Sequence, residues 1–187
     1  METEIQTRDC ELAGWAGQLS LVTADADTRG KAHLERSMGS LLRVVREQLN
    51  LEVVFVGEFV GGARVFRHVS ANAKEPVIQP GQSHPLDMTI CQRIVDGRMP
   101  RLMKSVAQVR SRYQLPEYYE VLGGHIGVPV QFADGNLYGV LCGFSFSECA
   151  HLDDRDVRRL EMAAGAAARL LAQAEGHDVD RSIDTLN

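Results

Sequence analysis

The sequence predicts an α+β domain: a central antiparallel β-sheet with the long N- and C-terminal helices on one face and short helices and lid loops on the other. Two observations carry this prediction. Apolar, strand-length runs meet at tight-turn dipeptides in two places, which is typical of β-hairpins. Long segments near the start and the end of the chain have apolar residues at intervals of three and four, the period of a helix face.

Two helices are expected before the first hairpin. One covers residues 9–22, and after a polar break over 24–30 a longer one runs over 31–49 and stops at Asn50. Their apolar faces comprise Leu12, Trp15, Leu19 and Val22 in the first and Leu34, Met38, Leu41 and Val45 in the second.

The first hairpin is predicted over residues 51–69, with Gly61 and Gly62 as a two-residue turn. Its first strand is apolar on both faces. The second strand is more polar and is expected nearer an edge of the sheet, with His68 as a solvated or edge-strand residue.

A polar crossover over residues 70–83 leads to a short helix over 85–96, with Pro85 near its first turn and Gly97 just after its end. Its inner face is expected to comprise Met88, Cys91, Ile94 and Val95. One short strand follows Pro100. The tyrosine-bearing segment 105–123 is divided by Pro116 into two short helical pieces and is interpreted as a lid over a pocket.

The second hairpin occupies residues 124–146, with Asp134-Gly135 as its turn. Its second strand is apolar on both faces and should be central in the sheet. Strict alternation places Tyr138, Val140, Cys142, Phe144 and Phe146 on one face. The glycines at 127, 139 and 143 indicate that a helix backbone or a ligand comes close to the sheet, and tight helix packing is the simpler of the two readings.

The last helix is predicted to start after Asp153, whose carboxylate would cap it. Its seam comprises Val157, Leu160, Ala164, Ala167, Leu171 and Ala174, a heptad spacing with small residues in the middle, so another helix can approach closely. The predicted organisation is an N-terminal helical extension (1–29), one domain (30–175) and a flexible tail (176–187).

Composition narrows the classes of function. The net charge is −5 with mixed signs, which argues against nucleic acid and acidic membrane surfaces as partners. No apolar run approaches a membrane span and the N-terminus does not resemble a signal peptide, so a cytoplasmic protein is expected. The four cysteines lack metal-site spacing and are expected to be reduced thiols, without a disulfide or a structural zinc.

The order of elements resembles a GAF domain over roughly residues 30–174. The matching blocks are LEVVFVGEFVGGARVF, PLDMTICQRIVDGRMPRL, HIGVPVQFADGNLYGVLCGFSF and LDDRDVRRLEMAAGAAARLLA. The chain looks most similar to bacterial sensory GAF modules that precede histidine kinases or cyclic-di-GMP enzymes. It departs from them at Ser105, where an acidic residue is usual. The resemblance implies a small-molecule sensor, a homodimer through the terminal helices and a signalling output partner.

The ligand-binding residues expected between sheet and lid are Phe66, Cys91, Tyr113, Tyr118, His125 and Cys142. In related GAF domains a cysteine near Cys91 attaches a bilin, although Gln92 stands here where photoreceptors often have histidine. His125 is the best candidate for an axial ligand of haem. Haem, bilin and cyclic nucleotide all remain open as cofactors. The alternative roles are structural: a small buried side chain for Cys91, a hydrogen-bonded histidine at the pocket rim for His125, and a solvated loop for the lid tyrosines.

The function predicted from these observations is non-enzymatic: a sensory and regulatory module that binds a small molecule and passes the signal through a helical dimer interface. Two alternatives remain. One is an enzyme like the free methionine-(R)-sulfoxide reductases, with Cys91 as nucleophile, although the lid has no resolving cysteine and Cys142 is expected to be buried. The other is a dimerisation module without a pocket. No hydrolase, phosphate-loop or metalloprotease motif is present.

Overall fold

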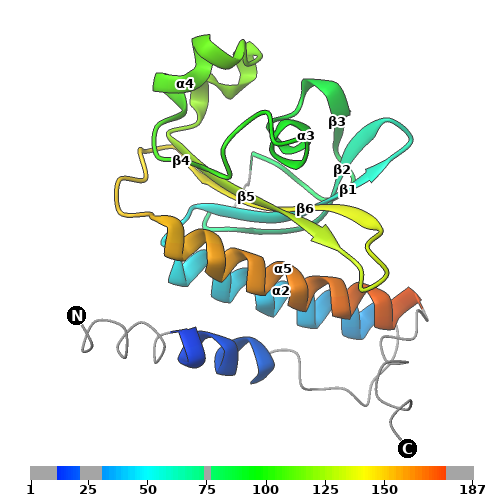
Figure 1. Cartoon of the computed structure of the whole chain (residues 1–187). Coiled ribbons are helices and arrows are strands. Elements are labelled where there is room, and N and C mark those ends of the chain that lie inside the picture. The colour runs from blue at the N-terminus through cyan, green and yellow to red at the C-terminus, as the bar shows by residue number, and fades with distance from the viewer. Residues whose placement is uncertain (1–11, 22–30, 74–76, 176–187) are drawn as a thin grey trace, which may run out of the picture.

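The structure, a computed structural model, describes residues 12–21, 31–73 and 77–175 of the 187-residue chain. It has three layers: short lid segments, a six-stranded antiparallel sheet, and a pair of long helices beneath the sheet (Figure 1). The predicted fold class is therefore confirmed. Cys10, Pro76 and the predicted tail over 176–187 lie outside the described residues.

The sheet has the strand order β3-β2-β1-β6-β5-β4. The strands are β1 (Val53–Val60), β2 (Ala63–Ala71), β3 (Ser83–Pro85), β4 (Leu102–Met103), β5 (Gly124–Gln131) and β6 (Leu137–Ser145). Both predicted hairpins are confirmed, and β6 is central, between β1 and β5. Gly61 and Gly62 both have positive φ, at 58° and 75°, which a two-residue turn of this hand requires.

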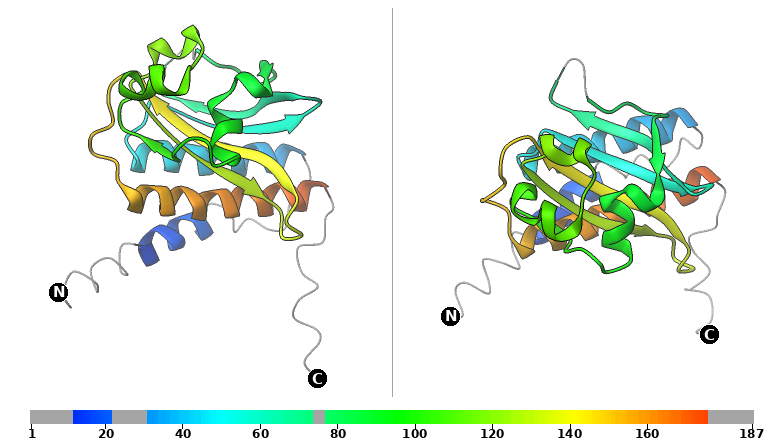
Figure 2. Two further views of the ribbon diagram at one scale, coloured as in Figure 1. Left: turned by 45° about the horizontal axis from the view of Figure 1, so that its top comes forward. Right: turned by 90° about the horizontal axis from the view of Figure 1, so that it is seen from above.

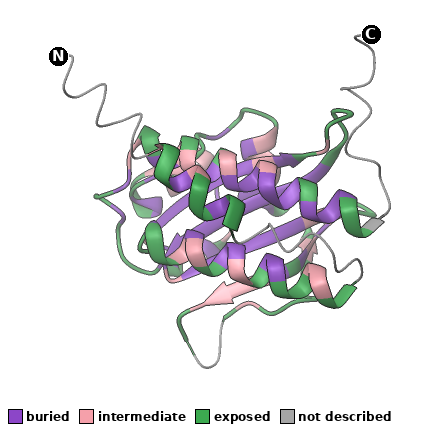
Figure 3. Ribbon diagram, turned by 90° about the horizontal axis from the view of Figure 1, so that it is seen from below, coloured by how far each residue is buried: buried purple, intermediate pink, exposed green. Residues whose placement is uncertain are grey.

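Two antiparallel helices, α2 (Lys31–Gln48) and α5 (Asp154–Glu175), cover the lower face of the sheet. Figure 3, seen from below, shows exposed and buried positions alternating along these helices. The predicted stop at Asn50 is confirmed, because Asn50 has the left-handed φ of 48°. Buried residues on the inner faces include Met38, Leu41 and Val45 in α2 and Leu160, Ala164, Ala167 and Leu171 in α5.

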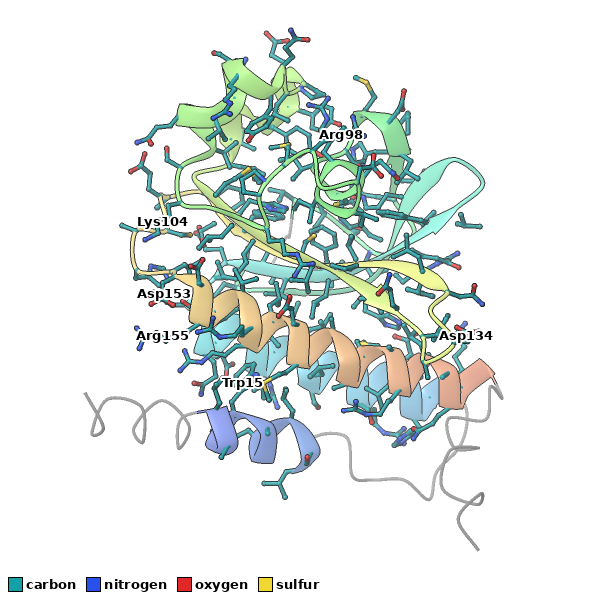
Figure 4. All side chains as sticks on the ribbon, in the orientation of Figure 1. Trp15, Arg98, Lys104, Asp134, Asp153 and Arg155 are labelled. Carbon is teal, nitrogen blue, oxygen red and sulfur yellow. The ribbon has the colours of Figure 1, made fainter. Side chains whose placement is uncertain are left out.

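A further helix over residues 12–21 lies below α2 and α5 (Figure 4). Its Trp15 and Leu19 are buried in the same apolar cluster as the long helices. The Trp15 indole Nε1 donates a hydrogen bond of 3.0 Å to the carbonyl of Arg159 in α5. The consecutive residues Ala166, Ala167 and Ala168 are all buried, so α5 is covered on more than one side by its own chain.

The predicted cap of the last helix is confirmed. The Asp153 carboxylate accepts the backbone N–H of Arg155 at 2.8 Å, and the Asp156 carboxylate accepts the backbone N–H of Asp153 at 2.9 Å. Hydrogen bonds from the Arg155 side chain and from the backbone N–H groups of Arg155 and Asp156 lower the pKa of Asp153 to about 2.

The lid side contains η1 (Leu86–Met88), α3 (Ile90–Val95), α4 (Val106–Tyr113) and η2 (Glu117–Val121). The two-piece lid divided at Pro116 is as predicted. The single helix predicted over 85–96 is wrong, because Pro85 ends β3 and the extended Thr89 separates η1 from α3. The Thr89 hydroxyl caps α3 by accepting the N–H of Gln92 at 3.2 Å. Met88, expected on the inner face, is 43% exposed as a result.

Two irregularities in the sheet reverse the predicted alternation of side chains. The register between β1 and β2 skips Arg67, which turns His68 toward the helices, where it is buried and lies 3.3 Å from the Glu35 carboxylate. The register between β5 and β6 skips Tyr138, which packs with the helix-side cluster. The predictions of a solvated His68 and of Tyr138 on the lid face are therefore wrong, whereas the position of β2 near an edge of the sheet is confirmed, because only the short β3 lies outside it.

The glycines of the second hairpin do mark close approaches, although the approaching group is not a helix backbone. A Cβ at Gly139 would lie 2.0 Å from the carbonyl oxygen of Gly57 in β1. One at Gly143 would meet Leu51 at 2.6 Å, and one at Gly127 would meet the Cys142 sulfur at 2.6 Å. Close packing within the sheet layer accounts for Gly139 and Gly143.

We expect opposite effects from two Gly→Ala substitutions. Gly39→Ala, on the exposed face of α2 with no atom within 4 Å of the new Cβ, should stabilise the fold by about 0.5–1 kcal/mol, because glycine costs backbone entropy in a helix. Gly139→Ala should destabilise it by about 2 kcal/mol or more, since β1 backbone occupies the space. Urea unfolding of both variants measures the difference, and equal midpoints would contradict this packing.

Candidate functional site

A cavity of about 470 Å³ lies between the upper face of the sheet and the lid. Figure 2, seen from above, shows the lid segments lying over the strands that form its floor. Its lining residues are Phe55, Arg64, Phe66, Val77, Ile78, Gln82, Ser83, His84, Cys91, Tyr118, Tyr119, Val121, Leu122, His125 and Phe144. The volume is within the range of small-molecule sites, which is roughly 300–1,000 Å³.

Arg64 provides the charge of the cavity. It precedes Phe66 by two residues on β2, so both side chains lie on the lid face of the sheet. The guanidinium carbon lies 4.0 Å from the centroid of the Phe66 ring, a cation–π contact. Gly57 on the neighbouring strand makes room for this side chain, because a Cβ there would lie 2.9 Å from Arg64 Cδ.

The guanidinium is buried without a carboxylate partner. Arg64 is only 4% exposed, and none of the ion pairs between described residues includes it. Nη2 lies 2.8 Å from Nδ1 of His84, Nη1 donates to the sulfur of Cys91 at 3.3 Å, and Nε has no hydrogen-bond partner. Burial opposes the charge, but Cys91, Tyr119 and Cys142 raise the pKa of Arg64 on balance, so the side chain stays cationic.

Two thiols from distant parts of the chain meet beside Arg64. The sulfurs of Cys91, in α3, and Cys142, in β6, are 3.9 Å apart, and both residues are buried. The hydrogen bond from Cys142 and the charge of Arg64 lower the pKa of Cys91 to about 6 against the opposing effect of burial. Burial and the neighbouring Cys91 raise the pKa of Cys142. Cys91 is therefore the member of the pair that ionises more readily, and Cys142 the one that keeps its proton.

His125 begins the far wall of the cavity on β5 and is 2% exposed. Its Nδ1 has no hydrogen-bond partner. Burial, with a smaller effect of Arg64, lowers the pKa of His125 to about 3. Burial and Arg64 also lower the pKa of His84. Both imidazoles are therefore neutral near pH 7 and can take part in hydrogen bonds without carrying charge.

The lid is attached to the segment around α3. The Tyr118 hydroxyl donates to the carbonyl of Met88 at 2.9 Å, and the Tyr119 hydroxyl accepts the backbone N–H of Ile90 at 3.1 Å. At the mouth of the cavity, Val77, Tyr118 and Val121 are 60%, 44% and 61% exposed, so an apolar rim surrounds a charged interior.

Four of the six predicted site residues, Phe66, Cys91, Tyr118 and His125, line the cavity. Cys142 lies behind Cys91, in contact with its sulfur. Tyr113 does not line it: it packs against the lid-side core, and its carbonyl accepts a hydrogen bond from Arg93.

The prediction missed Arg64 and His84. Arg64 shares a strand face with Phe66, which is the signal that could have found it. His84 is brought there by the pairing of β3 with β2, where it lies opposite Arg64.

The protein is an α+β domain with paired helices on one face of its sheet. On the other face, a cavity lies between the sheet and the lid. The family model of the GAF domain matches residues 32–172, so the chain belongs to the GAF family. A search of curated proteins finds no significant match.

Several solved structures share this fold at low sequence identity. A GAF sensor protein from Burkholderia vietnamiensis is 19% identical, with a TM-score of 0.68 over 90% of this chain and 98% of that one. The phycocyanobilin-bound GAF domain of a cyanobacterial phytochrome is 16% identical, with a TM-score of 0.68 over 89% and 98%. Free methionine-R-sulfoxide reductase from Neisseria meningitidis, in complex with its substrate, is 16% identical, with a TM-score of 0.66 over 86% and 88%. The GAF fold is that of sensory and regulatory domains in general.

The described residues contain neither a candidate membrane-spanning helix nor a candidate metal-binding cluster. None of the helices there has both the length and the hydrophobicity that a membrane crossing needs. Across residues 12–21, 31–73 and 77–175, no three His, Cys, Asp or Glu side chains gather as a metal site would require.

Burial of His125 predicts a specific pH dependence of stability. Its folded-state pKa of about 3 lies below the unfolded value of about 6.5, so between these values the unfolded chain binds the extra proton and stability falls as the pH falls. This residue should contribute a slope of up to about 1.4 kcal/mol per pH unit in that window. The free energy of unfolding in urea should therefore change less between pH 6.5 and 4 in His125→Asn than in the parent. If the free energies of unfolding of the two proteins changed equally with pH, the conclusion that His125 is buried and neutral would be wrong.

Proposed function

We propose that this chain is a sensory GAF module whose cavity binds a small organic anion. One observation carries the proposal: Arg64 is a buried, charged guanidinium that faces the cavity, has no carboxylate partner among the described residues and keeps Nε unpaired. A buried charge costs several kcal/mol unless an opposite charge and hydrogen bonds compensate it. Cys91 compensates the charge in part through Nη1, and a carboxylate or phosphate group of a ligand would add an opposite charge and a hydrogen bond at Nε.

The rest of the lining suggests the shape of that ligand. Phe55, Phe66 and Phe144 border the interior, and the apolar rim of Val77, Tyr118 and Val121 surrounds the mouth. His125 Nδ1 offers one further polar contact. The proposed ligand therefore has an anionic group near Arg64 and an apolar or planar body that reaches the rim. Haem, bilin and cyclic nucleotide all combine these features, so the proposal names a chemistry and not one compound.

Transmission is proposed to run from the lid to the terminal helices and through them to a second copy and a signalling output. The Tyr118 and Tyr119 hydrogen bonds tie the lid to the segment around α3, so a ligand under the lid would act on both. A ligand changes the equilibrium only if it binds two arrangements with different affinity. Hydrogen exchange of the lid and sedimentation of the protein, each with and without ligand, test this link. No change in either would contradict it.

A second candidate function is reduction of free methionine sulfoxide, which the proximity of Cys91 and Cys142 favours by providing the second thiol that the lid lacks. This function predicts NADPH-coupled reduction of free methionine sulfoxide by the parent protein and loss of that activity in Cys91→Ser.

The anion proposal predicts different behaviour for two arginines of the same strand. Arg64→Met should weaken binding of phenyl phosphate and benzoate at least about tenfold, since a hydrogen bond to a charged group contributes roughly 1.5–3 kcal/mol. Arg67→Met, at the exposed Arg67–Glu58 pair, should leave binding unchanged. Thermal shift and calorimetry measure both variants against the parent.

Uncharged benzyl alcohol is the control ligand for the same experiment. If it stabilised the protein as well as the two anions, or if Arg64→Met bound them like the parent, the anion proposal would be wrong. Mass spectrometry of the supernatant after heat denaturation would identify any anion that co-purifies with the parent and with Arg67→Met.

A further inference from the structure

The buried thiol pair has two members with different surroundings. Cys91 lines the cavity and accepts a hydrogen bond from Arg64, whereas Cys142 is not part of the cavity lining and contacts Cys91 from the side of the central strand. A molecule that enters the cavity therefore meets the Cys91 sulfur first. The two residues are 51 positions apart in the sequence and belong to a lid-side helix and the sheet, so a bond between them would join two layers.

Gly127 gives the pair its space. A Cβ at this position would lie 2.6 Å from the Cys142 sulfur, 3.1 Å from Ile94 Cδ1 of α3 and 3.2 Å from His125 Cε1. The absence of a side chain on β5 thus lets Cys142, α3 and His125 converge. Of the three glycines in the second hairpin, Gly127 is therefore the one whose nearest atoms belong to the thiol pair, to α3 and to His125.

We propose that Cys91 and Cys142 form a redox switch in which a hydroperoxide entering the cavity oxidises Cys91 and Cys142 then closes a disulfide between α3 and β6. Arg64 is the positioning residue, since its guanidinium favours the thiolate form of Cys91. The switch does not require the organic anion of the proposed function, and it uses a different reagent.

The chemistry balances in two steps. The Cys91 thiolate attacks the OH oxygen of the hydroperoxide, the O–O bond breaks, and the sulfur becomes a sulfenic acid. The other oxygen leaves as hydroxide or alkoxide and takes from water the proton that Cys91 released on ionising, which gives water or an alcohol. The Cys142 sulfur then attacks the Cys91 sulfur, the S–O bond breaks, and the departing hydroxide takes the Cys142 proton as water. The two thiols are oxidised by two electrons and the hydroperoxide is reduced by two; an external dithiol reverses the change.

The distances allow this bond after a small movement. The sulfurs are 3.9 Å apart, and a disulfide needs about 2.05 Å. We expect α3 to make this movement of about 2 Å. It is a six-residue helix, and its first N–H donates a hydrogen bond to the Tyr119 hydroxyl of the lid. Oxidation would also remove the thiolate from Arg64. The disulfide would therefore change both the wall and the charge of the cavity.

The test uses the full chain in a Cys10→Ser background with dilute hydrogen peroxide, followed by alkylation of the remaining thiols and peptide mass spectrometry. The expected result is a peptide pair linked through Cys91 and Cys142 that disappears with dithiothreitol. Cys142→Ser should instead accumulate a sulfenic acid on Cys91 that dimedone traps, and Cys91→Ser should consume peroxide at least about tenfold more slowly.

Cys149→Ser is the matched control, because Cys149 is also buried but is not a lining residue of the cavity. Its oxidation rate should equal that of the parent. Arg64→Gln should shift the pH at which Cys91 reacts to higher values, a readout that a purely structural role would not move.

The proposal is overturned if the folded parent yields no Cys91–Cys142 linkage, or if Cys149 is oxidised as fast as Cys91. Failure of phenyl phosphate and benzoate to bind would not affect this result, so the two proposals fail separately.

Discussion

A sheet that is apolar on both faces must be covered on both faces, and this requirement organises the molecule. β6 is buried along its whole length after Leu137, and β1 is buried from Val53 to Gly57. The lower cover consists of long, regular helices that pack closely through small residues. The upper cover consists of short segments joined by irregular chain, which cannot fill the space over the sheet completely. The cavity is a result of this difference between the two covers.

The chemistry of the cavity follows from one buried charge. Arg64 stacks on Phe66 and reaches both His84 and Cys91, but no carboxylate neutralises it within the described part of the chain. A thiolate at Cys91 and the anionic group of a ligand would therefore compete for the same guanidinium. If both proposals hold, the redox state of the thiols would affect ligand binding at this guanidinium, because a disulfide would leave the positive charge free for an incoming anion.

Local patterns predicted the elements and most of their ends. The paired glycines at 61 and 62, the Asn50 stop and the Asp153 cap are determined by nearby residues, so they can be recognised from short stretches. The two bulges cannot, because an extra residue in a strand follows from the pairing of two strands; His68 and Tyr138 were misplaced for this reason. The site was predicted in part, since the meeting of Arg64, Cys91 and Cys142 depends on contacts between distant segments.

The helix over residues 12–21 covers part of the surface through which α2 and α5 could pair with a second copy. It lies on the side of these helices that faces away from the sheet, and Trp15 fastens it to α5 through the carbonyl of Arg159. Two copies that paired through this same surface would have to dislodge the indole or incorporate the segment into the contact. The N-terminal segment and a second subunit would thus compete for one surface, and the free energy of burying a single tryptophan would reduce the affinity of self-association through it.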